Sequence, residues 1–290
     1  MVKLDENSLY LEYKSLLFSI AYRMLGRVSE AEDVVQETFL SYFERRRSDI
    51  TNHKAYLCKI TTNLCLDILK SARKKREVYV GPWLPEPYII TEDIPMNQMI
   101  SNDTLTISYL FMMETLTPTE RAVFLLKEVF RFSYNEIALI VNKNEANCRK
   151  IFTRAKSKIN PNFFESKLNN EKNQKVILDF LQAFQNGDMN KVISLVSEDV
   201  TLYSDGGGIV KAAINPIHTR DRVLAFILGI LKKAPDGLKT EVKNVNGHPG
   251  VLNTIQSGTH SVVSFYVQDG QIKNIYIIMN PEKLKHLQHS

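Results

Sequence analysis

The sequence predicts a multidomain protein in which two all-α helical domains are followed by an α+β domain with a curved antiparallel sheet. Three observations lead to this fold class. Apolar residues recur at three- and four-residue steps in residues 1–76 and again in 104–160, which is the period of amphipathic helices. Residues 77–103 contain four prolines, which forbid a long helix. Residues 171–290 contain short β-branched and aromatic runs separated by turn residues.

Length and composition limit the class of protein. At 290 residues the chain exceeds what one hydrophobic core usually serves, and its 44% hydrophobic and 24% charged residues are typical of globular proteins. No secretory signal or bilayer-spanning apolar run is present, so we expect a cytoplasmic protein without membrane contact. The three cysteines form no CxxC or Cys/His cluster. The sequence therefore predicts no metal site, no disulfide framework and no cofactor.

The first helical domain, residues 1–76, is predicted to contain three helices. Gly26 ends the first helix. Ser29 begins the second, which has acidic residues in its first turn, where the helix dipole favours them, and runs to about Arg47. Thr51 and Asn52 can cap the third, which ends in a basic run at Arg76.

The second helical domain, residues 104–160, contains a predicted helix-turn-helix over residues 115–158. Thr117 with Glu120, and Ser133 with Glu136, match the capping box that begins a helix. Six basic side chains lie between Lys143 and Lys158, in the final helix and just before it, and charge alone would also suit a solvated helix without a nucleic-acid role. Together with the paired capping boxes, this positive charge predicts a helix that reads the major groove of DNA. The residues expected at the DNA surface are Asn144, Glu145, Asn147, Arg149, Lys150, Thr153 and Arg154.

The linker and the C-terminal domain carry their own signals. An extended proline-rich segment that holds the chain's only tryptophan, Trp83, is expected to dock on another part of the protein. In residues 171–290 we expect a helix that ends at Gly187 and then a short helix. The strands expected after these helices are Val200–Ser204, Ile209–Ala213, Leu238–Val245, Gly250–Gln256, Ser261–Val267 and Ile272–Ile278.

Two stretches of the first domain carry a family resemblance. Residues Ala31–Phe39 and Ala55–Asp67 resemble the region 2 signatures of bacterial extracytoplasmic-function (ECF) sigma factors, and the helix-turn-helix resembles their region 4. The resemblance implies promoter-specific transcription initiation, with core RNA polymerase, through its clamp coiled coil and flap, and promoter DNA as partners. It implies polymerase contact by Asp33, Gln36 and Phe39. The loop Arg45–Lys54 and five residues of the third helix would recognise and open the −10 element, and region 4 would read the −35 element. Those five residues are Lys59, Thr62, Asn63, Asp67 and Arg73.

Four further motifs, taken in order, resemble the sigma-J-type subgroup, whose C-terminal domain is a SnoaL- or NTF2-like cone. They are Trp83–Pro87, Ser204–Gly208, Asn246–Gly250 and Asn280–Leu284. The resemblance implies that the cone docks the linker and regulates the helical domains in cis, so that no separate anti-sigma protein is required. The residues expected to carry this interdomain regulation are Trp83, Leu84, Pro85, Glu86, Pro87, Asp205, Gly206, Gly207, Gly208, Asn246, Pro249, Asn280 and Pro281.

One alternative is a helix-turn-helix regulator with a ligand-sensing or enzymatic cone. The groups available for catalysis are Asp205, His218, His248 and His260, and no pair of them has a spacing that specifies catalysis. An Asp that precedes Gly typically forms a tight turn, so we predict a turn or docking role for Asp205 and no enzymatic activity. Four aromatic residues could line either a cavity or a core, and we favour the core: Phe180, Phe184, Phe226 and Phe265.

Overall fold

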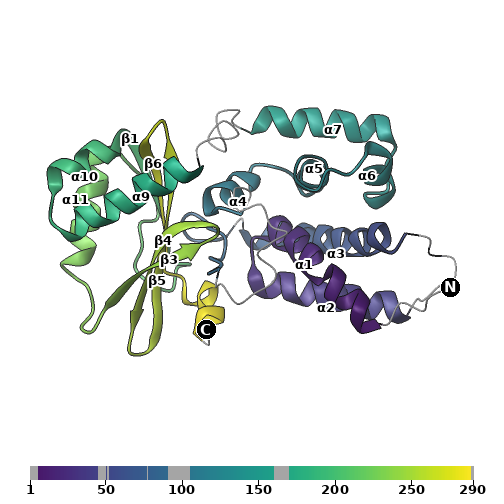
Figure 1. Cartoon of the computed structure of the whole chain (residues 1–290), viewed down its shortest axis with the longest axis horizontal. Helices are drawn as coiled ribbons and strands as arrows, with labels where there is room; N and C mark the ends of the chain where they lie inside the picture. The colour runs from purple at the N-terminus through teal and green to yellow at the C-terminus, as the bar shows by residue number, and fades with distance from the viewer. Residues whose placement is uncertain are drawn as a thin grey trace. The chain divides into compact units, whose positions relative to one another are not determined.

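The computed structural model describes residues 6–44, 50, 52–76, 78–90, 105–159 and 170–288, and it divides into two compact units (Figure 1). The first unit comprises the described residues of 1–77 and 112–160. The second comprises 78–90, 105–111 and 170–288, so the described part of the linker folds with the C-terminal sheet. No helix within these ranges is long and apolar enough to cross a bilayer.

Three packed helices form the first half of the helical unit: α1 (Glu6–Leu25), α2 (Val28–Glu44) and α3 (His53–Arg76). Gly26 follows α1 with a φ of 68°, a left-handed conformation that glycine adopts without a steric cost. The side-chain oxygen of Asn52 accepts a hydrogen bond from the Ala55 backbone N–H at 2.9 Å and so caps α3. The three predicted helices are confirmed. Of the expected loop Arg45–Lys54, residues 45–49 and 51 lie outside the described residues, and His53 and Lys54 already belong to α3.

The second half of the helical unit begins within α4 (Ile107–Met113) and continues through α5 (Pro118–Phe124), α6 (Tyr134–Ile140) and α7 (Glu145–Lys158). Both predicted capping boxes form, at Thr117 and at Ser133. A π-helical turn, Leu125–Val129, follows α5 and was not expected from the sequence.

A buried arginine joins the two halves of the helical unit. Arg121 on α5 donates a hydrogen bond to the Met24 carbonyl at 2.7 Å and pairs with Glu114 at 2.8 Å. Burial lowers the pKa of Arg121 to about 10, which leaves the guanidinium charged at neutral pH. The bond satisfies one of the carbonyls that the last turn of α1 leaves without an intrahelical donor.

The second unit contains a six-stranded sheet in the order β2-β1-β6-β5-β4-β3. The strands are β1 (Val196–Asp205), β2 (Ile217–His218), β3 (Lys239–Val245), β4 (His248–Ile255), β5 (Gly258–Gln268) and β6 (Gln271–Ile278). The expectation of a purely antiparallel sheet needs one correction, because β1 and β6 pair in parallel. After β1 and β2 the chain crosses through a helix to β3 at the far edge of the sheet. Successive hairpins then bring β6 back beside β1, and the two strands run in the same direction.

Two further expectations for this unit were wrong. Residues Ile209–Ala213 form no strand, because Gly206 begins a turn in which its carbonyl accepts from the N–H groups of Ile209 and Val210. A helix, α11 (Arg220–Leu231), was missed between the strands. The helices α9 (Asn170–Gln185) and α10 (Met189–Leu195) were expected, and all three cover one face of the sheet (Figure 1).

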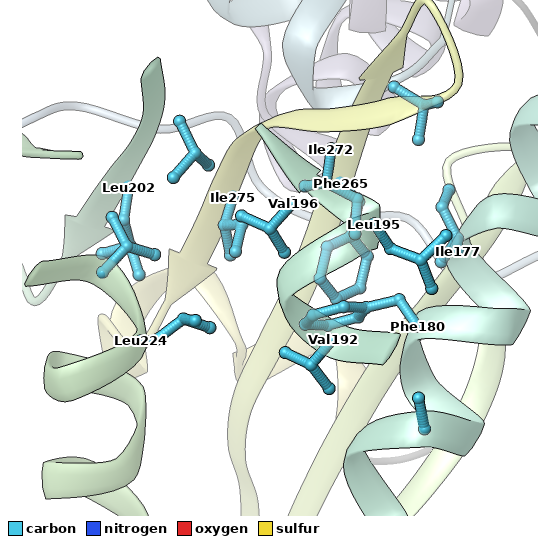
Figure 2. Packing of buried hydrophobic residues seen from close by; sticks show 14 of the residues in the cluster. Ile177, Phe180, Val192, Leu195, Val196, Leu202, Leu224, Phe265, Ile272 and Ile275 are labelled. Atoms are coloured by element: carbon cyan, nitrogen blue, oxygen red, sulfur yellow. The ribbon is translucent and has the colours of Figure 1, made fainter. Parts of the chain in front are cut away.

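The main core of this unit lies between the three helices and the sheet (Figure 2). Phe180 from α9 and Phe265 from β5 meet edge to face with ring centroids 5.6 Å apart. Both are buried, and Phe184 and Phe226 pack against the same cluster, so these four aromatic residues serve the core as expected.

The opposite face of the sheet carries a smaller core that includes the linker. Successive strand residues alternate between faces, so Tyr276 and Ile278 point away from the main core to which Ile277 belongs. They pack with Leu84 from the linker and Ile107 from the start of α4. The described part of the linker is therefore a structural part of the C-terminal domain.

Candidate functional sites

The exposed face of α7 contains the residues predicted to contact DNA. Six of the seven lie in the helix and are exposed: Glu145, Asn147, Arg149, Lys150, Thr153 and Arg154. Asn144 is the N-cap, and its side-chain oxygen accepts from the Asn147 N–H at 2.8 Å. Cys148, Ala155 and Ile159 hold the buried side. The structure therefore presents a basic helical surface to solvent.

Neighbouring helices hold α7 in place. Phe152 stacks on Phe124 of α5 with ring centroids 5.9 Å apart. Lys158 pairs with Glu120 at 2.7 Å, and the hydrogen bonds that Glu120 accepts from Lys158 and Thr117 hold its pKa below the usual value despite partial burial. The Arg149 guanidinium lies 4.4 Å from the centre of the Tyr134 ring. Lys158 and Arg149 thus have partners within the helical unit, which distinguishes them from the basic residues between them.

The α3 residues predicted to recognise the −10 element do not all reach the surface. Lys59 and Asp67 are exposed and Asn63 is half-buried, at a spacing of four residues that places them on one helical face. Thr62 is fully buried, so its side chain does not belong to the exposed surface that the other residues form, and its contact with DNA stays a prediction. Arg73 lies in the last turns of α3, where the side chains lie outside the described residues.

Of the three α2 residues predicted to contact polymerase, two are exposed and one is buried. Asp33 and Gln36 are exposed. Phe39 is only 4% exposed and packs against Tyr10 at 4.8 Å between ring centroids, so it supports the helix from beneath and does not form its surface. The exposed apolar side chain on this face is the neighbouring Leu40, at 58%.

Asp205, at the end of β1, holds the linker. Its side chain has no solvent exposure, and both carboxylate oxygens are engaged. One accepts from the Tyr79 hydroxyl at 2.5 Å and from the Gly207 N–H at 3.1 Å. The other accepts from the Leu84 N–H at 2.8 Å and from the Lys283 ammonium at 2.7 Å. One carboxylate thus connects the linker, the glycine turn and the C-terminal segment.

Lys283 supplies the positive charge at this point, and sequence reasoning did not single it out from its motif. Its ammonium also donates to the Leu84 carbonyl and lies 4.1 Å from the centre of the Trp83 ring. Asn280 donates to the Tyr79 hydroxyl at 2.8 Å. We call Asp205, Lys283, Asn280, Tyr79 and the Leu84 backbone the Asp205 anchor. Tyr79 was also missed, because a tyrosine at the start of a linker has no distinctive sequence signal.

A second attachment point lies around Asn246, in the turn between β3 and β4. Its side-chain oxygen accepts from the Tyr88 N–H at 2.8 Å, and its amide donates to the Leu105 carbonyl at 2.9 Å. Asn246 therefore connects Tyr88, in the described part of the linker, to Leu105, two residues before α4. Pro249 pairs with Asn244 in the same hairpin, and Pro281 opens a short 3₁₀ turn after Asn280.

The expected linker and glycine residues lie in this region. Leu84, Pro85, Glu86 and Pro87 are buried, and Trp83 is half-buried. A Cβ atom on Gly206 would lie 2.4 Å from the Val210 carbonyl oxygen, and one on Gly207 would lie 2.2 Å from the Asn280 amide nitrogen. Gly208 has a φ of 74° and faces Val80 of the linker. The turn therefore needs glycine for close approach and for backbone conformation.

The groups weighed for catalysis do not converge. Asp205 is occupied by four hydrogen-bond donors, as a docking and turn residue would be. His218 is on the edge strand β2, and its ring lies 3.2 Å from the Thr201 hydroxyl. Within the described ranges no three His, Cys, Asp or Glu side chains are grouped to hold a metal ion.

Comparison with known protein families identifies both helical regions. The family model Sigma-70 region 2 matches residues 9–75, and Sigma-70, region 4 matches residues 107–159. The helical unit is thus that of a sigma factor. The ECF RNA polymerase sigma factor SigJ of Mycobacterium tuberculosis is 30% identical over 280 residues, which cover 92% of this chain and 89% of SigJ. The chain therefore belongs to the ECF RNA polymerase sigma factors, the proteins of promoter-specific transcription initiation.

Other relatives also match the chain over its C-terminal domain. A probable ECF sigma factor SigI of Mycobacterium tuberculosis is 28% identical, with 95% of this chain and 93% of SigI covered. The crystal structure of Mycobacterium tuberculosis SigJ matches with a TM-score of 0.80 at 27% identity and covers 96% of this chain and 98% of that one. The expected fold class, two helical sigma regions followed by a SnoaL-like α+β domain, is confirmed.

Proposed function

We propose that the three helical surfaces divide the work of promoter recognition. The α2 face with Asp33, Gln36 and Leu40 contacts core RNA polymerase, and Phe39 supports it from beneath. The α3 face with Lys59, Asn63 and Asp67 contacts the −10 element. The α7 face reads the −35 element, with the polymerase flap as the partner of region 4. The exposure of these side chains supports the assignment, since only exposed groups can form such contacts.

We further propose that the C-terminal domain controls this activity in cis through the Asp205 anchor. The supporting observation is the buried Asp205 carboxylate, which is bound at once by Tyr79, the Leu84 backbone and Lys283. Fully extended, the linker 77–103 would span roughly 90 Å at about 3.3 Å per residue, and 78–90 account for roughly 43 Å of it. Holding 78–90 on the sheet shortens the reach between the two DNA-binding regions, which favours inhibition.

In this proposal no separate anti-sigma protein is required, and the chain works in the cytoplasm, where it meets polymerase. The inhibitory element lies on the same polypeptide, so its effective concentration does not depend on a second gene product. Release of the linker, not dissociation of a partner protein, is the activating step.

Reconstituted transcription tests the proposal. Core polymerase is combined with the full chain or with a chain that lacks residues 171–290, and run-off transcription and copurification with polymerase are measured. We expect both chains to copurify with polymerase and the two transcription levels to differ. Equal transcription by both chains would contradict control in cis, and failure of the full chain to copurify would contradict the assignment of the helical surfaces.

A further inference from the structure

The C-terminal domain contains a cavity that the proposed function does not use. It has a volume of about 340 Å³ and lies between the end of α11 and strands β4, β5 and β6. This volume falls at the lower end of the roughly 300–1,000 Å³ typical of sites for small organic ligands. Ile230 and Leu231 line it from α11, and Val263, Ile277 and Met279 line it from the sheet side. Leu231 is 46% exposed, so an apolar side chain stands at an opening to solvent.

Four polar side chains stand among the mostly apolar residues that line the cavity: Lys233, Asn253, His260 and Ser261. Asn253 and Ser261 face each other across β4 and β5, and the Asn253 amide donates to the Ser261 hydroxyl at 2.9 Å. The Asn253 side-chain oxygen already accepts from the Thr240 hydroxyl at 2.8 Å. Ser261 therefore keeps its own hydroxyl proton for a further acceptor. Lys233 adds a positive charge to the lining, which contains no acidic side chain.

A bulge in β5 adds a histidine to the lining of the cavity. The register passes from Thr254 opposite Thr259 to Asn253 opposite Ser261, which leaves His260 as an extra residue on β5. In a regular strand two successive side chains point to opposite faces, but here His260 and Ser261 both line the cavity. Bulges redirect side chains in this way and are common beside binding sites.

We propose that this cavity binds a small organic acid with an apolar body. The body packs against Ile230, Val263 and Ile277, the carboxylate accepts hydrogen bonds from Ser261 and His260, and Lys233 supplies a positive charge to the same cavity. An excess of donors with one cation and no acid among the lining residues favours an anionic acceptor over a cationic or purely apolar ligand.

The cavity is one residue away from the Asp205 anchor. The Met279 side chain lines the cavity, while its backbone N–H donates to the Asp205 carbonyl at 2.8 Å. The next residue, Asn280, donates from its N–H to the same carbonyl at 2.9 Å and belongs to the anchor. A ligand that displaces Met279 therefore changes the geometry of the anchor. The regulatory meaning of this coupling rests on the proposed function, whereas the binding site and the change at the anchor do not.

Titration of decanoate into the full chain tests the site, and the chain provides its own reporter. Trp83 is the only tryptophan, and its ring centre lies 4.1 Å from the Lys283 ammonium in the anchor. We expect saturable binding of one decanoate per chain by calorimetry, with Kd below about 0.5 mM, and a change in Trp83 emission over the same concentrations. We expect 1-decanol, which has the same apolar body and no charge, to bind at least about fivefold more weakly.

Two substitutions at the mouth give a matched pair. Leu231→Glu places a negative charge at the opening of the cavity, where it repels an anionic ligand, and is expected to weaken decanoate binding about tenfold, while Leu231→Lys, equally polar, is expected to preserve it. Absence of saturable binding, or equal decanoate affinity in wild type and Leu231→Glu, would overturn the site. Equal affinity for decanol would overturn the carboxylate assignment. Decanoate binding without a Trp83 response would overturn the coupling, and none of these results depends on whether the anchor controls transcription.

Discussion

The surface of α7 and the Asp205 anchor both depend on charged side chains, but they place those charges in opposite environments. On α7 the Arg149 and Glu145 side chains are 60% and 47% exposed and lie 3.3 Å apart. At the anchor the Lys283 and Asp205 side chains are 4% and 0% exposed and lie 2.7 Å apart. Exposed pairs contribute little to stability, whereas loss of one partner of a buried pair leaves an uncompensated charge.

The difference predicts how each region responds to substitution. The charges on α7 are available to an external polyanion, and changing one of them leaves the fold intact. The charges at the anchor are buried and paired with each other, and we expect that changing one of them releases the linker. Substitutions on α7 should therefore change DNA recognition alone, and substitutions at the anchor should change stability and linker position together.

The largest effect is expected from Asp205→Asn. It leaves the buried Lys283 ammonium without its carboxylate, which costs roughly 3–5 kcal/mol for a buried pair. Urea unfolding of the full chain, followed by Trp83 emission, measures the loss. The control is Asp199→Asn in the same strand, because the Asp199 side chain is 74% exposed in its pair with Lys273 and should cost below about 1 kcal/mol. Equal losses in the two variants would show that the anchor is not a buried pair.

A smaller effect is expected from Gly207→Ala. The new Cβ would lie 2.2 Å from the Asn280 amide nitrogen, so Asn280 must move away from Tyr79. Gly237→Ala is the matched control, because Gly237 has a similar positive φ of 74° and no atom within 4 Å of its Cβ position. Both variants carry backbone strain of about 1–2 kcal/mol, and Gly207→Ala should exceed the control by at least about 1 kcal/mol in thermal unfolding. A difference of zero would mean that the turn makes no close contact with Asn280.

At the DNA surface we expect Arg154→Ala to reduce run-off transcription from the cognate promoter while copurification with polymerase is unchanged. A base or phosphate contact of this kind is worth about 1–3 kcal/mol, or roughly fivefold or more in transcription at limiting protein. Lys158→Ala, a basic residue of the same helix whose ammonium pairs with Glu120, should reduce transcription less. Loss of polymerase binding in Arg154→Ala would contradict the division of labour between the surfaces.

The smallest effect is expected from Ser133→Ala, which removes the cap of α6 and should cost about 1 kcal/mol. The Ser133 side-chain and backbone hydrogen bonds hold the pKa of Glu136 below its usual value. Because the pKa of Glu136 is lower in the folded chain than its unfolded value of about 4.3, the ionised carboxylate stabilises the fold at pH values above about 4.3. This stabilisation is lost as the pH falls through the folded-state pKa. The difference between Ser133→Ala and wild type should therefore narrow when unfolding is measured at acidic pH. A difference independent of pH would show that Glu136 takes no part in the cap.

The sequence predicted features with local causes. Thr117 and Ser133 could be recognised as caps because each capping box lies within four residues, and the exposed face of α7 followed from helical period and charge. The glycines after Asp205 marked a turn for the same reason. Asp205 and Asn280 could be assigned to linker docking only through the order of four separate motifs, because contacts between distant segments leave no local pattern.

The features that were missed depend on long-range packing. The parallel pairing of Leu202 with Ile275 joins segments far apart in the sequence, and no local signal indicates its direction. Phe39 and Thr62 lie beside exposed residues, and the family motif did not show that they turn inward. The helix α11 is rich in aliphatic residues and lies between strands, so its period was not separated from theirs.

Run-off transcription with core polymerase, with the full chain carrying Asp205→Asn or Asp199→Asn, tests the central claim most directly. The claim is that the Asp205 anchor restrains the sigma regions through the linker. We expect Asp205→Asn to raise transcription at least about threefold over wild type at equal polymerase occupancy, because the released linker restores the reach between the regions, and Asp199→Asn to match wild type. Transcription by Asp205→Asn equal to or below that of Asp199→Asn would contradict the claim.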